Sequence, residues 1–496
     1  MRIYKTPGVY PEEVSSLLPS VVALDTAIPA FIGYTEKRPS NSVEAYKISS
    51  MAEYLALFGG PFPEPFPNVE VGKAGDFFEV NQLPSAPAQP TYWLYYQLQM
   101  FFANGGGACY IVSVKTYGSG VDKADLDKGI NALMKEDEPT LILIPDAIGV
   151  LPANPNDISL SNYYGLYKNA LSQCASMKDR FAIIDIHKGT EELSATNTAI
   201  ADFRNKIGSN FLSYGATYFP WLHTTLEYHY EESRIAIAGA DLPQADIKLK
   251  YDTSSLSALP DDPDGDGTPF PDEDAKRNHY ESRSLYHLDN QAYRRIKTEL
   301  DSFQVTLPPS GAIAGIYARV DSSRGVFKAP ANVSLNNVAR PAVKVSNEKQ
   351  EGLNLHPTGK SINAIRSFTG KGVMVWGART LDGNSNEWRY ISVRRLFIFL
   401  EESISKAIER FVFEPNDEGT WVKVKGTIEN FLGDQWRAGA LAGNTAKQAF
   451  FVHAGLGITM TPQDILEGRL VVDVGVAAVR PAEFIVLRFS HKLQEG

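Results

Sequence analysis

The chain has 496 residues, of which 43% are hydrophobic and 21% charged, and its formal net charge is −10. A chain of this length holds about two to four domains and buries enough apolar surface to fold without disulfides. The acidic average field repels phosphate, and the longest basic clusters are the pairs Arg294-Arg295 and Arg394-Arg395, so nucleic-acid binding is not expected.

The cysteines and the N-terminus indicate the compartment. Cys109 and Cys174 show no metal-ligand spacing, and Cys109 lies in an apolar run typical of a buried, reduced thiol. The N-terminus has no apolar signal-peptide core, and no apolar run approaches the length of a membrane span. We therefore expect synthesis in the cytoplasm, no direct membrane insertion, and any release by lysis or another non-classical route.

The first half of the chain predicts an α/β fold. A proline-broken extended arm comes first, and a proline-rich loop insertion follows at 60–90. From residue 92, helices and strands alternate, which predicts a mainly parallel sheet. Strands are expected at 21–24, 30–34, 109–114, 140–145, 181–186 and 216–220, and helices at 92–103, 123–134, 163–177 and 196–207.

The second half interrupts and then replaces this alternation. Residues 224–310 indicate an insertion with an acidic surface loop at 260–274 and a helix at 292–303. A smaller α+β domain is expected from near Gly372. Its predicted elements are strands at 373–377, 450–454, 470–479 and 483–492, an extended stretch at Val422 and Val424, and helices at 392–411 and 427–442.

Two glycine motifs resemble phosphate-binding loops but have the wrong context. Gly105, Gly106 and Gly107 follow a helix and precede a strand, the reverse of a dinucleotide site, so they indicate a helix stop. The segment 358–361 resembles the end of a P-loop, but Asn354 occupies the position of the first glycine. ATP binding is therefore not expected.

An acidic stretch has the spacing of a calcium-binding loop. Asp262, Asp264 and Asp266, followed by Glu273, place hard oxygen ligands at alternate positions. Pro269 and Pro271 would disturb such a loop, so a solvated acidic loop is the favoured interpretation and calcium binding the alternative. No other cofactor is expected.

The chain offers little for nucleophilic catalysis. Asp185 and His187 could share one face at the end of a strand, but no serine partner can be placed and no G-x-S-x-G elbow is present. We therefore do not expect an enzyme.

A series of segments along the chain carries a family resemblance. The segments are Thr6–Tyr10 with Glu12-Glu13, 28–33, 102–106, 308–319, 324–332, 376–380, 390–395, 413–416 and 480–484. In this order they resemble the tail sheath proteins of contractile phages, R-type pyocins and extracellular contractile injection systems. Each segment alone is modest, whereas their number and order make the resemblance specific.

The resemblance implies a fold and a domain layout. It implies a subtilisin-like α/β domain without a catalytic site, a smaller α+β C-terminal domain that faces an inner tube, and extended arms at both ends. The expected regions are a linking arm at 1–24, an N-terminal sheath region with the proline-rich insertion at 25–110, the α/β domain at 111–370 with its insertion at 224–307, and the C-terminal domain at 371–496.

It also implies which residues join subunits. The arm and the terminal strand are expected to add to a neighbour's sheet, which pairs backbone groups that an isolated strand leaves open. The predicted linking residues are Ile3, Tyr4, Val9, Tyr10, Val14, Phe484, Val486, Arg488 and Ser490. The helix predicted at 427–442, with Trp436 and Arg437, could contact the tube or pack in the core, and both interpretations are open.

The resulting hypothesis is a structural subunit that polymerises helically around an inner tube and contracts to drive it through a target envelope. Expected partners are many copies of the chain, the tube protein, and baseplate and terminator or cap proteins. The alternatives are a sheath terminator or adaptor of the same machine and a serine hydrolase of subtilisin-like fold. The particle is either a virion or a phage-tail-like machine assembled in a bacterial cytoplasm.

Overall fold

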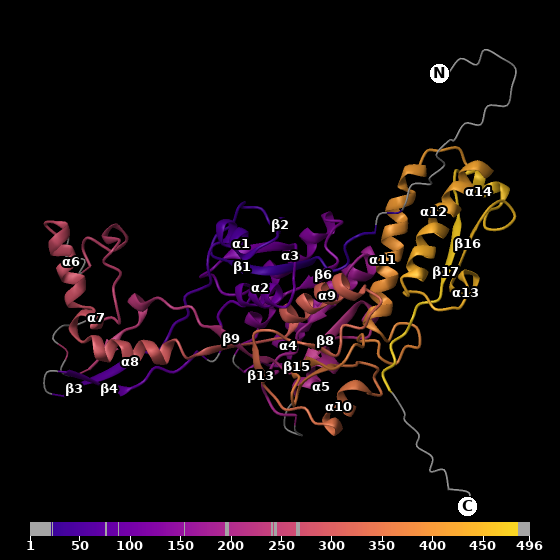
Figure 1. The fold of residues 1–496 in the computed structure, drawn as a ribbon. Coiled ribbons are helices and arrows are strands. Elements are labelled where there is room, and N and C mark those ends of the chain that lie inside the picture. The colour runs from indigo at the N-terminus through magenta and orange to yellow at the C-terminus, as the bar shows by residue number, and fades with distance from the viewer. Residues whose placement is uncertain are drawn as a thin grey trace, which may run out of the picture. The chain divides into compact units, whose positions relative to one another are not determined.

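The computed structural model describes residues 21, 23–74, 77–87, 89–152, 154–193, 198–239, 242, 246–263 and 268–484. The chain divides into two compact units, and each is described by itself (Figure 1). The α/β unit contains residues 27–324 and 328–391, and the C-terminal unit contains the described residues up to 26, 325–327 and those from 392 onward. Within the described part, no helix is both long and apolar enough to cross a membrane.

A nine-stranded sheet forms the centre of the α/β unit, in the order β12-β15-β14-β8-β7-β6-β1-β5-β2. The six strands from β14 to β5 run parallel, whereas β2, β15 and β12 each pair antiparallel with a neighbour. The strands are β1 (Pro29–Thr35), β2 (Ala45–Ile48), β5 (Cys109–Thr116), β6 (Leu141–Leu143), β7 (Phe181–Ile184), β8 (Gly215–Phe219), β12 (Val333–Ser334), β14 (Asn363–Phe368) and β15 (Gly372–Val375).

The parallel strands are apolar over most of their length because parallel sheets are covered on both faces. Every residue of β1, β6, β7 and β8 is buried. The helices of this unit are α1 (Met51–Phe58), α2 (Leu94–Ala103), α3 (Lys123–Ala132), α4 (Asp157–Met177), α5 (Ala199–Lys206), α9 (Ser310–Arg324) and α10 (Asn347–Asn354). The predicted alternation of helix and strand from residue 92 to 220 is confirmed.

Helices α2 and α9 approach each other closely because α9 presents glycines at the contact. A Cβ atom added to Gly311 would lie 2.3 Å from the backbone oxygen of Gln97, and one added to Gly315 would lie 2.4 Å from that of Phe101. The Gln97 side chain bridges the two segments, since its Nε2 donates to the Pro308 carbonyl and its Oε1 accepts from the Gly311 N–H, both at 2.7 Å. Only glycine permits this backbone approach.

Gly105 ends α2 as the sequence predicted. Its φ of +102° is in the region that favours glycine, and the N–H of Gly106 bonds the Phe101 carbonyl. The expected strand at 21–24 is wrong for the described residues 21, 23 and 24, which form no regular structure. Leu24 instead bonds the Ser403 hydroxyl through its N–H, at 3.4 Å.

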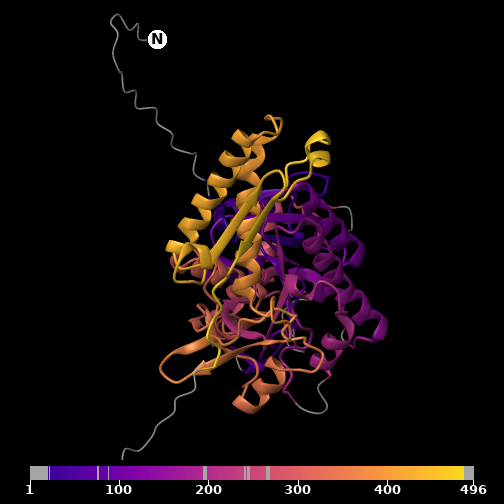
Figure 2. The same ribbon diagram turned by 90° about the vertical axis from the view of Figure 1, so that its right-hand side faces the viewer.

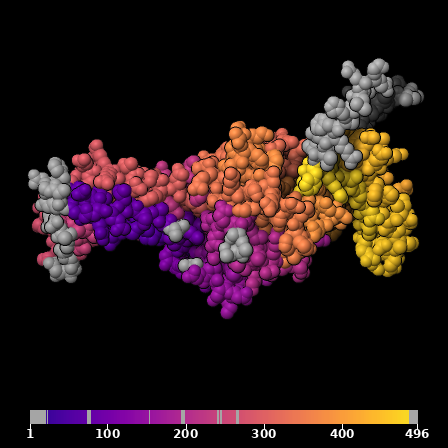
Figure 3. Space-filling model, turned by 90° about the horizontal axis from the view of Figure 1, so that it is seen from below, coloured from indigo at the N-terminus to yellow at the C-terminus, as the bar shows by residue number. Residues whose placement is uncertain are grey.

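The two predicted insertions fold together into a smaller layer of the α/β unit. The proline-rich stretch is not only a loop, because it contains strands β3 and β4, which pair with each other while β3 also pairs with β10. Figure 3 shows this indigo segment against the pink residues of the second insertion, and α8 contacts β4. The elements are β3 (Val69–Ala74), β4 (Phe77–Gln82), β10 (Ile237–Ala238), α6 (Glu273–Ser282), α7 (Leu285–Leu288) and α8 (Asn290–Leu300).

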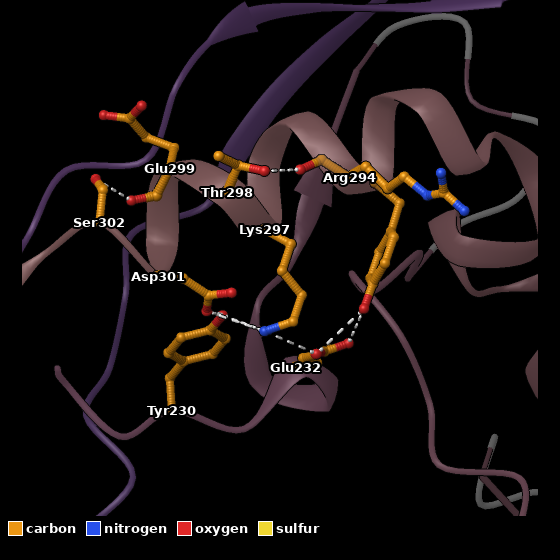
Figure 4. A network of polar contacts seen from close by, with 9 residues as sticks. Tyr230, Glu232, Arg294, Lys297, Thr298, Glu299, Asp301 and Ser302 are labelled. Atoms are coloured by element: carbon orange, nitrogen blue, oxygen red, sulfur yellow. Dashed lines mark hydrogen bonds and ion pairs between the residues drawn. The ribbon is translucent and has the colours of Figure 1, made fainter.

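A polar network fixes α8 to the segment before it (Figure 4). The Lys297 amine donates to the Tyr230 hydroxyl and to Asp301, both at 2.9 Å, and lies 3.5 Å from Glu232. Glu232 in turn accepts from the hydroxyl of Tyr293, at 3.1 Å. A small antiparallel sheet of β9 (Leu222–Glu227), β11 (Gln304–Leu307) and β13 (Val338–Pro341) connects the insertion to the rest of the unit.

The C-terminal unit packs two long helices against a β-hairpin, as Figure 2 shows in orange and yellow. Its core consists of apolar residues spaced three or four apart on the helices, among them Leu396, Leu400, Val424 and Ile428, together with Val452 of the hairpin. The elements are α11 (Ile391–Ile408), α12 (Glu418–Arg437), α13 (Ala446–Ala449), β16 (Phe450–Ala454), α14 (Pro462–Leu466) and β17 (Val472–Val476).

The structure of this region differs from two expectations. Val422 and Val424 lie inside α12, not in an extended stretch, because the Asp417 carboxylate caps a helix that starts at Glu418. Residues 372–391, expected in the C-terminal domain, fold with the α/β unit, where β15 forms a hairpin with β14.

Candidate functional site

The β16–β17 hairpin is a sheet of two strands with open edges. The strands pair antiparallel in register from Phe450 opposite Val476 to Ala454 opposite Val472. Across the described residues no third strand joins this sheet. Since the outward N–H and C=O groups of an edge strand need partners, the hairpin can accept an added strand on either side.

The two faces of the hairpin differ. Val452 is buried against α12, whereas Phe451 and His453 on the opposite face are exposed. The Phe451 ring covers Gly475 of the neighbouring strand, where an added Cβ would lie 2.2 Å from the ring. One face therefore fixes the hairpin to its unit, while no strand from the described part of the chain pairs with its edges.

Phe484, the predicted linking residue that the structure describes, is 68% exposed. The other predicted linking residues lie outside the described part of the chain: Ile3, Tyr4, Val9, Tyr10, Val14, Val486, Arg488 and Ser490. The structure therefore leaves the predicted strand addition as a prediction.

Trp436 and Arg437, the two residues predicted for tube contact, have different surroundings. The Trp436 ring packs against the core of the C-terminal unit, and its Nε1 donates to the Gly443 carbonyl at 2.9 Å. Arg437 is exposed and forms an ion pair with Asp434 on the same helix. Trp436 thus has a packing role in this unit, and Arg437 is the one of the two that presents its side chain to the surface.

Asp185 and His187 are both buried but have different partners. The Asp185 carboxylate accepts from the hydroxyl of Ser310 at 2.6 Å and from its N–H at 3.2 Å. His187 Nδ1 lies 2.9 Å from the Tyr164 hydroxyl, and its Nε2 lies 3.5 Å from Asp202. Burial raises the pKa of Asp185 to about 7 and lowers that of His187 to about 4. The arrangement orients Ser310 toward a carboxylate, not toward an imidazole base.

A second buried carboxylate lies where the strand order of the parallel sheet reverses. At such switch points, α/β proteins commonly bind ligands. Here Asp146, just after β6, accepts from the N–H groups of Tyr34 at 2.6 Å, Trp93 at 2.5 Å and Leu94 at 3.1 Å. The chain's own backbone therefore occupies this carboxylate, whose pKa burial raises to about 6. The sequence analysis did not identify Asp146. The one pattern that could have indicated it is the dipeptide Pro145-Asp146, which follows an apolar strand.

Comparison with known proteins identifies the family. The phage tail sheath C-terminal domain model matches residues 384–492, and the phage tail sheath protein central domain model matches residues 269–381. The anti-feeding prophage (AFP) helical sheath in the contracted state is 30% identical, with 99% of this chain and 100% of that chain covered and a TM-score of 0.60. This chain belongs to the contractile tail sheath family. It is a structural sheath subunit.

Two further relatives agree with this family assignment. The PVC sheath of an extracellular contractile injection system, in the contracted state, is 28% identical over 100% of this chain and 99% of that chain, with a TM-score of 0.61. The tail sheath protein of Vibrio phage KVP40 is 32% identical over 129 residues, which is 25% of this chain. That match spans 19% of the phage protein's length.

The acidic loop of this sheath protein lies partly outside the described residues. Asp264 and Asp266 are outside, whereas Asp262 and Glu273 are described. In the described ranges no group of three or more His, Cys, Asp or Glu side chains could hold a metal ion. Glu273 is exposed in the first turn of α6, where an acidic side chain favours the helix dipole. The solvated-loop interpretation therefore stays a prediction, with calcium binding as the alternative to be tested.

Proposed function

We propose that this chain polymerises into a helical sheath around an inner tube and that contraction of the sheath drives the tube through a target envelope. The open-edged β16–β17 hairpin is the observation that carries this proposal. Two relatives of this chain support the proposal: the AFP protein forms a helical sheath in the contracted state, and the PVC protein forms a sheath complex in the contracted state. A subunit that carries an acceptor sheet and supplies extended segments can link copies without limit.

The proposed donors are Ile3–Val14 of one neighbour and Phe484–Lys492 of another. Each donor strand adds a ladder of backbone hydrogen bonds, which pairs groups that the isolated hairpin leaves open. Each donor segment stays covalently attached to its own unit while it pairs with a neighbour. Copies can therefore rotate as rigid bodies and stay connected while the lattice changes.

The proposed energy source is the lattice itself. The extended sheath is metastable, and contraction buries additional surface between copies, so a small gain per copy becomes large over many copies. No nucleotide is required, because the energy is stored during assembly. We also propose that the α/β unit is subtilisin-like in fold and has no catalytic site. The order of its strands and the hydrogen bond from Ser310 to Asp185 support this proposal.

Deletion of residues 1–20 tests the proposal directly. Val21 packs against the core of the C-terminal unit, so the deletion ends before the first core residue. We expect the truncated protein to fold with an unchanged melting temperature and to form no long tubes in negative-stain electron microscopy. If tubes of normal length form, the linking role of the arm is wrong.

The same images separate the alternatives. Rings would favour a sheath terminator or adaptor, and single particles labelled by a fluorophosphonate probe would favour a serine hydrolase. The proposed partners are many copies of this chain, the tube protein, and baseplate and cap proteins, within a virion or phage-tail-like particle assembled in a bacterial cytoplasm. Nucleic acid and membrane insertion have no part in the proposed mechanism.

A further inference from the structure

Exposed apolar side chains gather at one end of the C-terminal unit. Nine of the seventeen exposed large hydrophobic residues in the described chain belong to this unit, although it contains a minority of the residues. Six of them lie on the α11–α12 turn, on the start of α12 and on the β16–β17 connection. This set, called the tip, consists of Val412, Phe413, Val422, Leu456, Ile458 and Leu466.

The parts of the tip are held side by side. The Asn416 side chain donates to the Arg469 carbonyl at 3.0 Å and accepts from Trp421 Nε1 at 2.7 Å, which ties the α11–α12 turn to the hairpin connection. Figures 1 and 2 both show α14 at the same end of the unit as that turn. The tip is therefore a defined surface.

Phe413 is the most unusual residue of the tip. Its φ of +72° is in the left-handed region, which a bulky side chain adopts only when the surroundings impose it, and its side chain is fully exposed. The backbone conformation costs free energy in an isolated protomer, and the exposed ring contributes no burial that would offset it. Strained and exposed residues of this kind are characteristic of sites completed by a partner.

The charges identify the partner surface. Glu414 follows Phe413 directly, and Glu418 is the first residue of α12. The exposed residues at this end that form no ion pair across the described ranges include the acidic Glu409, Glu414 and Glu418 and the basic Arg410 and Lys423. Lys447 on α13 and Arg480 after β17 are likewise exposed and have no ion-pair partner there. Helix α13, which carries Lys447, precedes β16 directly, and Arg480 lies four residues after the end of β17. Figure 1 shows α13 at the open end of the hairpin, opposite the connection that contains α14. Acidic side chains are thus in the majority among the unpaired residues at the tip, whereas Lys447 and Arg480 are basic, and opposite charges favour contact between the two ends.

We propose that the tip of one copy docks, with Phe413 inserted, onto the basic open end of the C-terminal unit in a second copy. This inference rests on the proposed function. Contact between one end of a unit and the other end of the next copy is head-to-tail, which generates an open helical array instead of a closed dimer. A tube that slides out during contraction needs weak contacts with the sheath, so a buried aromatic anchor suits a neighbouring copy better than the tube.

The F413G variant of the full-length chain tests the inference. Glycine removes the anchor and also relieves the left-handed strain, so the protomer should melt at a higher temperature than wild type. We nevertheless expect the critical concentration for tube formation, measured by sedimentation and negative-stain microscopy, to rise at least about tenfold. I158S, which removes an exposed apolar side chain of the α/β unit, is the matched control and should assemble like wild type.

Charge reversal provides an independent test of the inference. E414K should weaken assembly, and K447E in the same chain should restore part of it. Normal tubes from F413G, with wild type also forming tubes, would overturn the inference. If F413G tubes of this kind also failed to bind the tube protein, Phe413 would contact the tube and not a second copy of the chain. If wild type itself formed no tubes, the proposed function would fail instead.

Discussion

The carboxylate of Asp185, directly after β7, accepts hydrogen bonds from both the hydroxyl and the backbone N–H of Ser310, the first residue of α9. In an active serine hydrolase the serine hydroxyl donates to an imidazole that can remove its proton. Here the carboxylate caps the helix and ties it to the central sheet. The pair joins two segments 125 residues apart in sequence and thereby helps to fix the α/β unit.

The Asp185 carboxyl should make the stability of the α/β unit depend on pH. Burial raises its pKa from 3.8 to about 7 in the folded chain, so the folded state binds the proton more tightly than the unfolded state between these values. Taken alone, this carboxyl should lower the free energy of unfolding as pH rises from about 4 to 7, by at most about 1.4 kcal/mol per pH unit. His187, whose pKa burial lowers to about 4, opposes this slope between about pH 4 and 6.5. Urea unfolding across this range measures the slope.

The D185N variant is the matched test, because asparagine keeps a donor and an acceptor for Ser310 but does not titrate. Glu64, Asp146 and His187 also titrate with shifted pKa values, but they do so in both proteins. We therefore expect the free energy of unfolding of the wild type, relative to that of D185N, to fall as pH rises from about 4 to 7. An unchanged slope in D185N would show that Asp185 does not titrate in this window.

The close approach of α2 and α9 predicts an asymmetry between two glycines. An added Cβ at Gly315 would lie 2.4 Å from the Phe101 carbonyl oxygen, which belongs to a helix backbone and cannot move freely. G315A should lower the free energy of unfolding by about 1–3 kcal/mol. G352A in α10, where an added Cβ meets nothing within 4 Å, should raise it by about 0.5–1 kcal/mol. Equal effects in thermal unfolding would contradict this packing.

Local patterns in the sequence predicted the fold where local and tertiary preferences agree. The apolar strands around Ile32, Ile142 and Ile183 have both faces covered, so their hydrophobic runs matched what the sheet requires. The segment from Val422 to Lys425 alternates apolar and charged residues like a strand, yet it is helical. Its helix is decided by the Asp417 cap and by the burial of Val424 and Ile428 against the core, which the local alternation did not reveal.

The candidate site was only partly readable from the sequence for the same reason. The strands at 450–454 and near 472 could be predicted, but that they form a sheet of two with open edges depends on which other segments pair with them. Trp436 was equally compatible with a surface and a core position until the structure placed its ring against the core. The tip was missed because its residues are separated in sequence and meet only through the fold.

Trp436 and Arg437 should separate stability from tube binding. W436A should lower the free energy of unfolding by about 1–3 kcal/mol, because it removes core contacts and leaves the Gly443 carbonyl without its indole donor. R437E should change stability by less than about 1 kcal/mol, since the ion pair with Asp434 is exposed. We expect R437E to reduce co-sedimentation with the tube protein. Normal co-sedimentation of R437E would remove Arg437 from the tube contact.

Calcium should not bind the acidic loop. Asp272 already caps α6 by accepting from the Ala275 N–H at 2.7 Å, and Asp261 accepts from the Lys276 amine at 2.6 Å, so carboxylates on both sides of the loop have partners in the protein. Isothermal titration with calcium to millimolar concentration is expected to give no heat beyond dilution. A saturable heat that disappears in D262N would establish a calcium site.

Single prolines in β17 can locate the edge that accepts a donor strand. Neighbouring residues of an antiparallel strand direct their N–H groups alternately toward the paired strand and away from it. D473P and V474P therefore each remove one N–H, and only one of the two belongs to the ladder with β16. The substitution that breaks this ladder should lower the melting temperature of the protomer, because proline also disrupts strand pairing.

The other substitution should leave the protomer's hairpin paired and yet prevent tube formation, since the lost N–H is the one offered to a neighbouring copy. If that second variant forms normal tubes, the outer edge of β17 does not receive a strand, and the acceptor edge would have to be β16.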